Sequence, residues 1–159
     1  MAISAVASRD KDIFVSFSLN NKGLLFSGET AVHAVKAILR ENETKANGTI
    51  RAVLFNCCSP EAADIALRQV HHHQPIQQLL RRQNIRFGVY ANRVSTCVPA
   101  GWTMSTMDTA LPMRQDLSPE KYADIVLKWI RELGVNIVGG CCGMGPEYIS
   151  ELHNRIHTI

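Results

Sequence analysis

The chain has 159 residues, of which 46% are hydrophobic and 19% are charged. A chain of this length and composition can bury the core of one domain, which excludes wholesale disorder and a small fold held together by disulfides. The formal net charge of +3 is small and its charges are scattered, so nothing indicates a nucleic-acid or membrane surface.

The first half of the chain predicts two strand–helix pairs. Residues 13–18 form a β-branched and aromatic run that closes on a turn, and apolar residues then recur at helical spacing over residues 30–41. Residues 50–55 are again strand-like. Ser59 and Pro60 follow as a typical helix cap and first helical residue, so a second helix begins there, with its alanines, Leu67 and Val70 facing inward.

The second half predicts two more pairs. A strand over residues 85–90 leads into a long connection, residues 93–117, and long connections in compact domains tend to be functional. A helix then runs from Ser118 and Pro119 to the stop signal Gly134, with Trp129 in its apolar face. The last pair is a strand over residues 135–139 and a helix from Pro146, whose inward residues are expected to be Ile149, Leu152 and Ile156.

This alternation predicts an α/β fold with parallel strands joined by right-handed crossovers. Four βα units could form a small open sheet, but they also correspond to half of a (β/α)8 TIM barrel, which needs about 250 residues. We expect a single domain over residues 1–159, with residues 1–12 flexible. In either arrangement, ligands collect at the carboxyl ends of the strands.

Polar and sulfur-bearing side chains follow each predicted strand. Cys57 and Cys141 are 84 residues apart in the sequence, but parallel topology brings both strand ends to the same rim, where three thiols can meet. Residues expected at this rim are Ser16, Ser18, Asn56, Cys57, Tyr90, Asn92, Cys141 and Cys142.

Three thiols with room for a fourth ligand are typical of a catalytic zinc site. The glycines that flank Cys141 and Cys142 allow both cysteines to turn toward one ion. A thiol substrate bound there would be a thiolate near neutral pH, so no side-chain general base is required. Ser16, Asn56 and Asn92 are candidate substrate-binding residues, although the two asparagines have an equally good interpretation as residues that tie off strand ends or orient a cysteine.

Two segments carry a resemblance to a known family. Residues 139–149, Gly-Gly-Cys-Cys-Gly-Met-Gly-Pro-Glu-Tyr-Ile, resemble the terminal motif of the homocysteine S-methyltransferase family. Residues 56–61, Asn-Cys-Cys-Ser-Pro-Glu, are similar to its upstream cysteine motif, and the two motifs occur in the family's order. The likeness runs from about Ile13 to Ile156, and within it Tyr148 stands where the family usually has histidine.

Members of that family are (β/α)8 barrels that bind Zn²⁺ through three cysteines and methylate the thiol of homocysteine to give methionine. The resemblance implies Cys57, Cys141 and Cys142 as the metal ligands, with Cys57 chosen over Cys58 because the family cysteine directly follows the asparagine. It also implies a cationic methyl donor such as S-methylmethionine, S-adenosylmethionine or a betaine.

The resemblance covers only the carboxyl-terminal half of the family barrel. A half-barrel would expose two strand edges and an apolar interior, so we expect a homo-oligomer or pairing with a complementary half-barrel. Two alternatives remain open. One is a non-catalytic zinc-binding or interaction module derived from this barrel, and the other is a redox protein that uses Cys141 and Cys142.

Other features of the sequence have ordinary explanations. Five cysteines are an odd number, no secretory signal is evident and no apolar run reaches the length of a membrane span, so we expect a cytoplasmic protein. Cys58 and Cys97 are expected to be plain buried or half-buried thiols. The tract of residues 71–73 and the pair His153 and His157 are expected at the surface, and Trp102 is expected to cover the site or to anchor its own loop.

Overall fold

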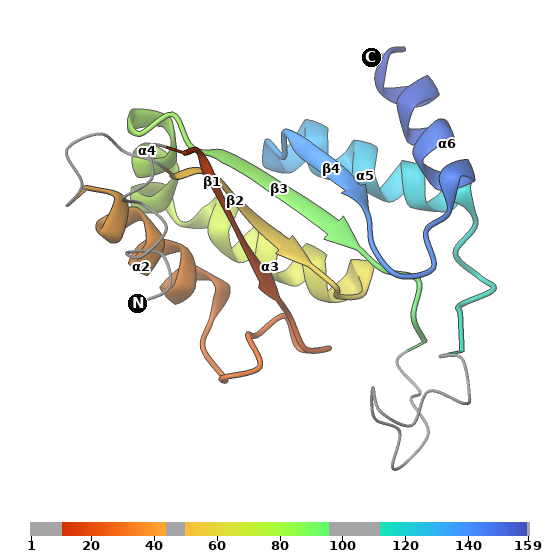
Figure 1. The fold of residues 1–159 in the computed structure, drawn as a ribbon, viewed down its shortest axis with the longest axis horizontal. Helices are drawn as coiled ribbons and strands as arrows, with labels where there is room; N and C mark the ends of the chain where they lie inside the picture. Colours follow the sequence, from red (N-terminus) through yellow and green to blue (C-terminus); the bar gives the residue numbers. More distant parts are fainter. Residues whose placement is uncertain (1–10, 44–49, 96–111, 159) are drawn as a thin grey trace.

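The computed structural model of the chain describes residues 11–43, 50–95 and 112–158 (Figure 1). The strands β1 to β4 form one sheet in which neighbours in sequence are neighbours in space, and all three pairs are parallel. The elements are β1 (Ile13–Ser18), α2 (Ala31–Glu43), β2 (Ile50–Asn56), α3 (Pro60–His72), α4 (Gln74–Arg82), β3 (Arg86–Ala91), α5 (Pro119–Leu133), β4 (Ile137–Gly140) and α6 (Pro146–Ile156).

The predicted α/β fold is therefore confirmed, and its four βα units have the arrangement of half a TIM barrel. The helix caps formed as the sequence predicts. Ser59 accepts from the backbone N–H of Ala62 at the start of α3, and Ser118 accepts from Lys121 at the start of α5. Gly134 ends α5 in the left-handed conformation.

The helices pack against one face of the sheet, where the core lies (Figure 1). The side chains of this face come from alternate strand positions, such as Val53 and Phe55 of β2 and Val89 of β3. Trp129 is 1% exposed, which confirms its prediction as a core residue.

The opposite face of the sheet corresponds to a barrel interior, and its side chains interlock across strands. Leu54 of β2 fills the space above Gly88 of β3, because a Cβ built on Gly88 would lie 2.4 Å from Leu54 Cδ2. Tyr90 lies over Gly139 in the same way, one layer nearer the carboxyl ends of the strands. Phe14, on the edge strand β1, is 55% exposed on this face.

Two details differ from the sequence-based expectation. Helix α4 was not predicted, because its nine residues are mostly polar and bury only Ile76 and Leu80. The prediction that Ile149 faces inward was wrong, since this side chain is 46% exposed. Helix α6 instead buries Tyr148 and Leu152, and Ile156 is only partly buried.

The structure describes only parts of the amino terminus and of the long connection after β3. Residues 1–10 and 96–111 lie outside the described ranges, and with them most of the segment expected to be flexible, as well as Cys97 and Trp102. Among the helices that the structure describes, none is long and apolar enough to cross a membrane.

Candidate metal centre

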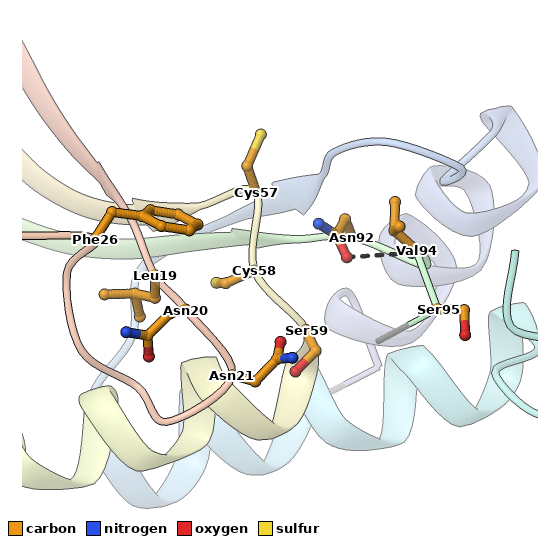
Figure 2. A pocket seen from close by; sticks show the side chains of 10 residues that line it. All are labelled: Leu19, Asn20, Asn21, Phe26, Cys57, Cys58, Ser59, Asn92, Val94 and Ser95. Atoms are coloured by element: carbon orange, nitrogen blue, oxygen red, sulfur yellow. Dashed lines mark hydrogen bonds between the residues drawn. The ribbon is translucent and has the colours of Figure 1, made fainter. Parts of the chain in front are cut away.

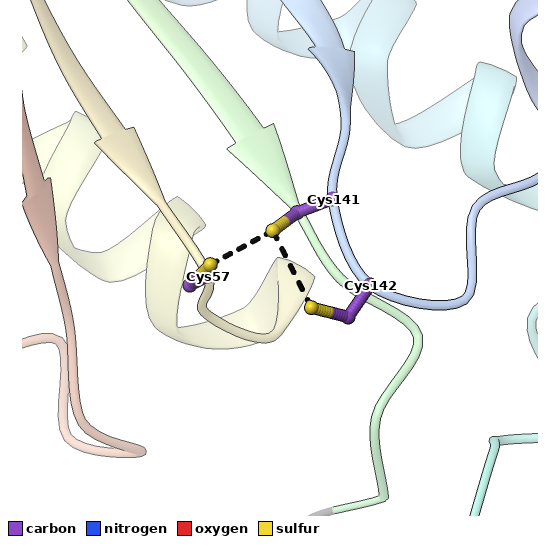
Figure 3. A group of neighbouring side chains, drawn as sticks. All are labelled: Cys57, Cys141 and Cys142. Carbon is purple, nitrogen blue, oxygen red and sulfur yellow. Dashed lines mark hydrogen bonds between the residues drawn. The ribbon is translucent and has the colours of Figure 1, made fainter.

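Three cysteine sulfur atoms meet at the carboxyl ends of β2 and β4 (Figure 3). The Sγ atoms of Cys57 and Cys141 are 2.8 Å apart, and those of Cys141 and Cys142 are 3.7 Å apart. All three lie within 4.8 Å of one another, and no other group of three or more possible metal ligands occurs in the described ranges. The parallel topology thus brings together the three thiols that the sequence placed on one rim.

Cys57 reaches the cluster because the backbone turns sharply as β2 ends. Its φ of 49° lies in the left-handed region, which is uncommon for a residue with a side chain. The backbone N–H of Cys57 donates to Tyr90 O at 3.2 Å, so the turn stays attached to β3. Cys58 then points into the core and is 3% exposed, as expected for a plain buried thiol.

Cys141 and Cys142 lie on the loop between β4 and α6. Cys141 N–H continues the ladder to β3 by donating to Ala91 O at 2.9 Å, and Cys141 O accepts from Met144 N at 3.0 Å, which closes a turn. Gly143 has a φ of 79°, a conformation that favours glycine. The start of the loop is held by Tyr122 of α5, whose hydroxyl donates to Gly139 O at 2.6 Å.

The proximity of the three thiols separates their pKa values. Burial, together with the hydrogen bond to Cys141, raises the pKa of Cys57 to about 12. The hydrogen bond with Cys141 also raises the pKa of Cys142. Burial opposes ionisation of Cys141, but the hydrogen bonds from Cys57 and Cys142 outweigh it and lower the pKa of this thiol. Without a cation, the cluster therefore carries its negative charge first on Cys141.

Asn56 contacts the cluster directly. Its side-chain nitrogen lies 3.6 Å from Cys57 Sγ and donates to it, while its oxygen accepts from the hydroxyl of Ser18 at 3.3 Å. This arrangement favours the interpretation that Asn56 orients a cysteine. Ser16 lies in β1 beside Leu54, one layer further from the rim, so Ser18 is the β1 serine that contacts the site. The sequence places both serines at this rim, and the strand register, which pairs Ser18 with Asn56, distinguishes them.

Asn92 lines a pocket of about 200 Å³ next to Cys57 (Figure 2). The pocket lies between the turn that follows β1, the loop that follows β2 and the chain that leaves β3. Asn92 Oδ1 accepts from Val94 N at 3.2 Å, and its backbone N–H donates to Cys58 O at 2.8 Å, so Asn92 also ties off the end of β3. The complete lining is Leu19, Asn20, Asn21, Phe26, Cys57, Cys58, Ser59, Asn92, Val94 and Ser95.

The histidines do not belong to the cysteine cluster. They lie at the surface or make hydrogen bonds that are unrelated to it. His153 on α6 and His157, which follows the helix, are both exposed, as expected. Within the tract of residues 71–73, His71 lies within hydrogen-bond distance of Leu133 O, and His73 caps α4 by accepting from Ile76 N. The sequence did not indicate these two contacts, because they depend on α4 and on the end of α5.

Comparison with known proteins finds the same family that the two cysteine motifs resemble. The family model described as homocysteine S-methyltransferase matches residues 1–156. Homocysteine S-methyltransferase 1 of Saccharomyces cerevisiae is 24% identical over 159 residues, an alignment that covers 97% of this chain and 44% of the yeast protein. The chain thus spans less than half the length of that relative. Because the family model covers nearly all of it, the chain belongs to the homocysteine S-methyltransferase family.

Proposed function

We propose that this chain is the zinc-binding half of an enzyme that transfers a methyl group to the thiol of homocysteine, giving methionine. The observation that carries the proposal is the convergence of three sulfur atoms from two motifs that are distant in sequence. Membership of the homocysteine S-methyltransferase family supports the reaction and the substrate. Cys57, Cys141 and Cys142 are the proposed ligands of Zn²⁺.

The donor set suits zinc. Thiolates are preferred zinc ligands, and three protein ligands leave one tetrahedral position for a substrate. Zinc–sulfur bonds of 2.3 Å place tetrahedral sulfur ligands about 3.8 Å apart. The separation of 3.7 Å between Cys141 and Cys142 already matches this value. The 2.8 Å separation of Cys57 and Cys141 is about 1 Å shorter, so these two half-buried side chains must rotate apart when the metal binds.

Bound Zn²⁺ supplies the stabilisation that keeps a homocysteine thiol deprotonated near neutral pH. The protein's own residues orient the reactants. Asn56 directs Cys57, and Tyr122 fixes the end of β4. The adjoining pocket, with the amides of Asn20, Asn21 and Asn92, offers hydrogen-bonding groups for the polar part of an amino acid.

The methyl donor and the rest of the barrel come from outside this half. We propose a cationic donor, such as S-methylmethionine, S-adenosylmethionine or a betaine, because an anionic cluster of thiolates attracts a cation. The edges of the described sheet are β1 and β4, so pairing with a second copy or a complementary half-barrel would cover them. A monodisperse monomer in light scattering would contradict this pairing.

Metal analysis and an activity assay together test the proposal. We expect about one zinc per chain after purification, removable by a thiol chelator. With the barrel complete, we expect methyl transfer to homocysteine that stops on zinc removal and returns on zinc addition. Stoichiometric zinc without methyl transfer, in a complete barrel supplied with each of the three donors, would instead support the non-catalytic module. Absence of zinc would contradict both.

Zinc affinity should rise with pH. Cys57 and Cys142 have raised pKa values in the metal-free cluster, so both carry protons near pH 7 and must lose them when the metal binds. Release of at least these two protons strengthens the apparent affinity at least about 100-fold for each pH unit below those pKa values. Chelator competition at pH 6.5 and 7.5, with a pH indicator dye to count the protons, measures both quantities. Affinity that does not change with pH would contradict this coupling.

A further inference from the structure

Arg93, which follows β3, contacts the loop that carries Cys141 and Cys142. Its backbone N–H donates to Cys142 O at 2.9 Å, and its own carbonyl accepts from Arg114 N at 2.9 Å. The loop also packs on the Arg93 side chain, because a Cβ built on Gly143 would lie 3.2 Å from Arg93 Cβ. The segment after β3 therefore packs directly against the loop that carries two of the three thiols.

The side chain of Arg93 extends this support to the beginning of α6. Its Nη1 donates to the hydroxyl of Tyr148 at 2.8 Å, and that hydroxyl donates to Leu117 O at 2.5 Å. Tyr148 is 1% exposed, so its ring cannot shift without disturbing the core. Arg93 thus joins three segments at one point: the cysteine loop, the first turn of α6 and the chain before α5.

Burying the Arg93 guanidinium has an energetic cost, because not all of its donors form hydrogen bonds. Within the described residues, Arg93 Nε is buried without a hydrogen-bond partner, which is a cost that a shorter or apolar side chain would avoid. What the guanidinium gains is the contact with Tyr148, and that contact fixes the end of the loop opposite to the one held by Tyr122.

We propose that Arg93 and Tyr148 are positioning residues that hold Cys141 and Cys142 in the metal-binding geometry. This inference rests on the proposed zinc site. Residues that orient metal ligands typically contribute 10- to 100-fold in metal affinity. Because Arg93 and Tyr148 act through the same contact, the effects of replacing them should not add.

The test measures zinc affinity by chelator competition in Tyr148→Phe, Arg93→Met and the double variant. We expect each single variant to bind zinc about 10-fold more weakly, and the double variant to lose little more. Arg93→Lys keeps a cation that can donate to the Tyr148 hydroxyl, so it should recover part of the affinity. Cobalt-substituted protein gives a spectroscopic signature, and we expect shifted ligand-field bands in Tyr148→Phe and Arg93→Met.

Arg155→Met is the matched control. Arg155 also joins α6 to α5, through Asp124 Oδ1 at 2.6 Å and Glu120 O at 3.3 Å, but it does so away from the cysteine loop. It should lower the thermal midpoint of the metal-free chain and leave zinc affinity and the cobalt spectrum unchanged. Wild-type affinity in Tyr148→Phe and Arg93→Met, or an equal loss in Arg155→Met, would overturn the inference. A wild-type chain that binds no zinc would overturn the proposed function instead.

Discussion

Replacing Cys141 with alanine should abolish stoichiometric zinc binding while leaving the fold intact. Cys141 lies between the other two thiols, 2.8 Å from Cys57 Sγ and 3.7 Å from Cys142 Sγ. Its removal leaves only two sulfur atoms, which is fewer than the three protein ligands of a catalytic zinc site. We expect apparent zinc affinity to fall by more than about 100-fold, because a lost ligand costs more than a lost supporting contact. Elemental analysis after gel filtration and chelator competition measure the change.

Cys58→Ala is the control, with the opposite pattern of effects. Cys58 is 3% exposed and belongs to the core, so alanine there removes buried volume and should cost about 1 kcal/mol of folding free energy. Its sulfur is not part of the cluster, and zinc content should stay at the wild-type value. If Cys141→Ala retains zinc, or if Cys58→Ala loses it while still folded, the assignment of the ligands is wrong.

The sequence was sufficient to predict the strands and most of the helices, because local signals and burial agree there. Strand β1 has the predicted bounds, and α3 buries all of the alanines expected to face inward, together with Leu67 and Val70. Helix α4 escaped prediction because it has only nine residues, most of them polar, and its apolar face is limited to one or two turns around Ile76 and Leu80. Ile149 was assigned to the wrong face because Tyr148, one residue earlier, makes the buried contacts of α6.

The convergence of the cysteines followed from topology alone. Once the strands are parallel and consecutive, the ends of β2 and β4 must lie on one rim, even with β3 between them. The supporting contacts could not be predicted in that way. The positive φ of Cys57 and the reach of Tyr122 and Arg93 across elements depend on how the helices pack, which no local pattern records.

The close packing of the interior face of the sheet requires a glycine at position 88. Gly88 lies in β3 between Leu54 of β2 and Ile137 of β4. A Cβ there would lie 2.4 Å from Leu54 Cδ2 and 2.7 Å from both Cβ and the backbone oxygen of Ile137. The Leu54 methyl group can rotate away, but the backbone of β4 cannot move without breaking its pairing with β3.

Gly88→Ala should therefore destabilise the fold by about 1–3 kcal/mol, which is the range for overpacking a filled core. For a chain of this size, that lowers the thermal midpoint by roughly 2–12 °C. Gly139→Ala is the matched control, because its Cβ would meet only the ring of Tyr90, at 3.1 Å, and this side chain can yield. Both variants restrict the unfolded chain equally, so their difference reports the native clash. Equal midpoints in thermal melts of the two metal-free variants would contradict the close contact between β3 and β4.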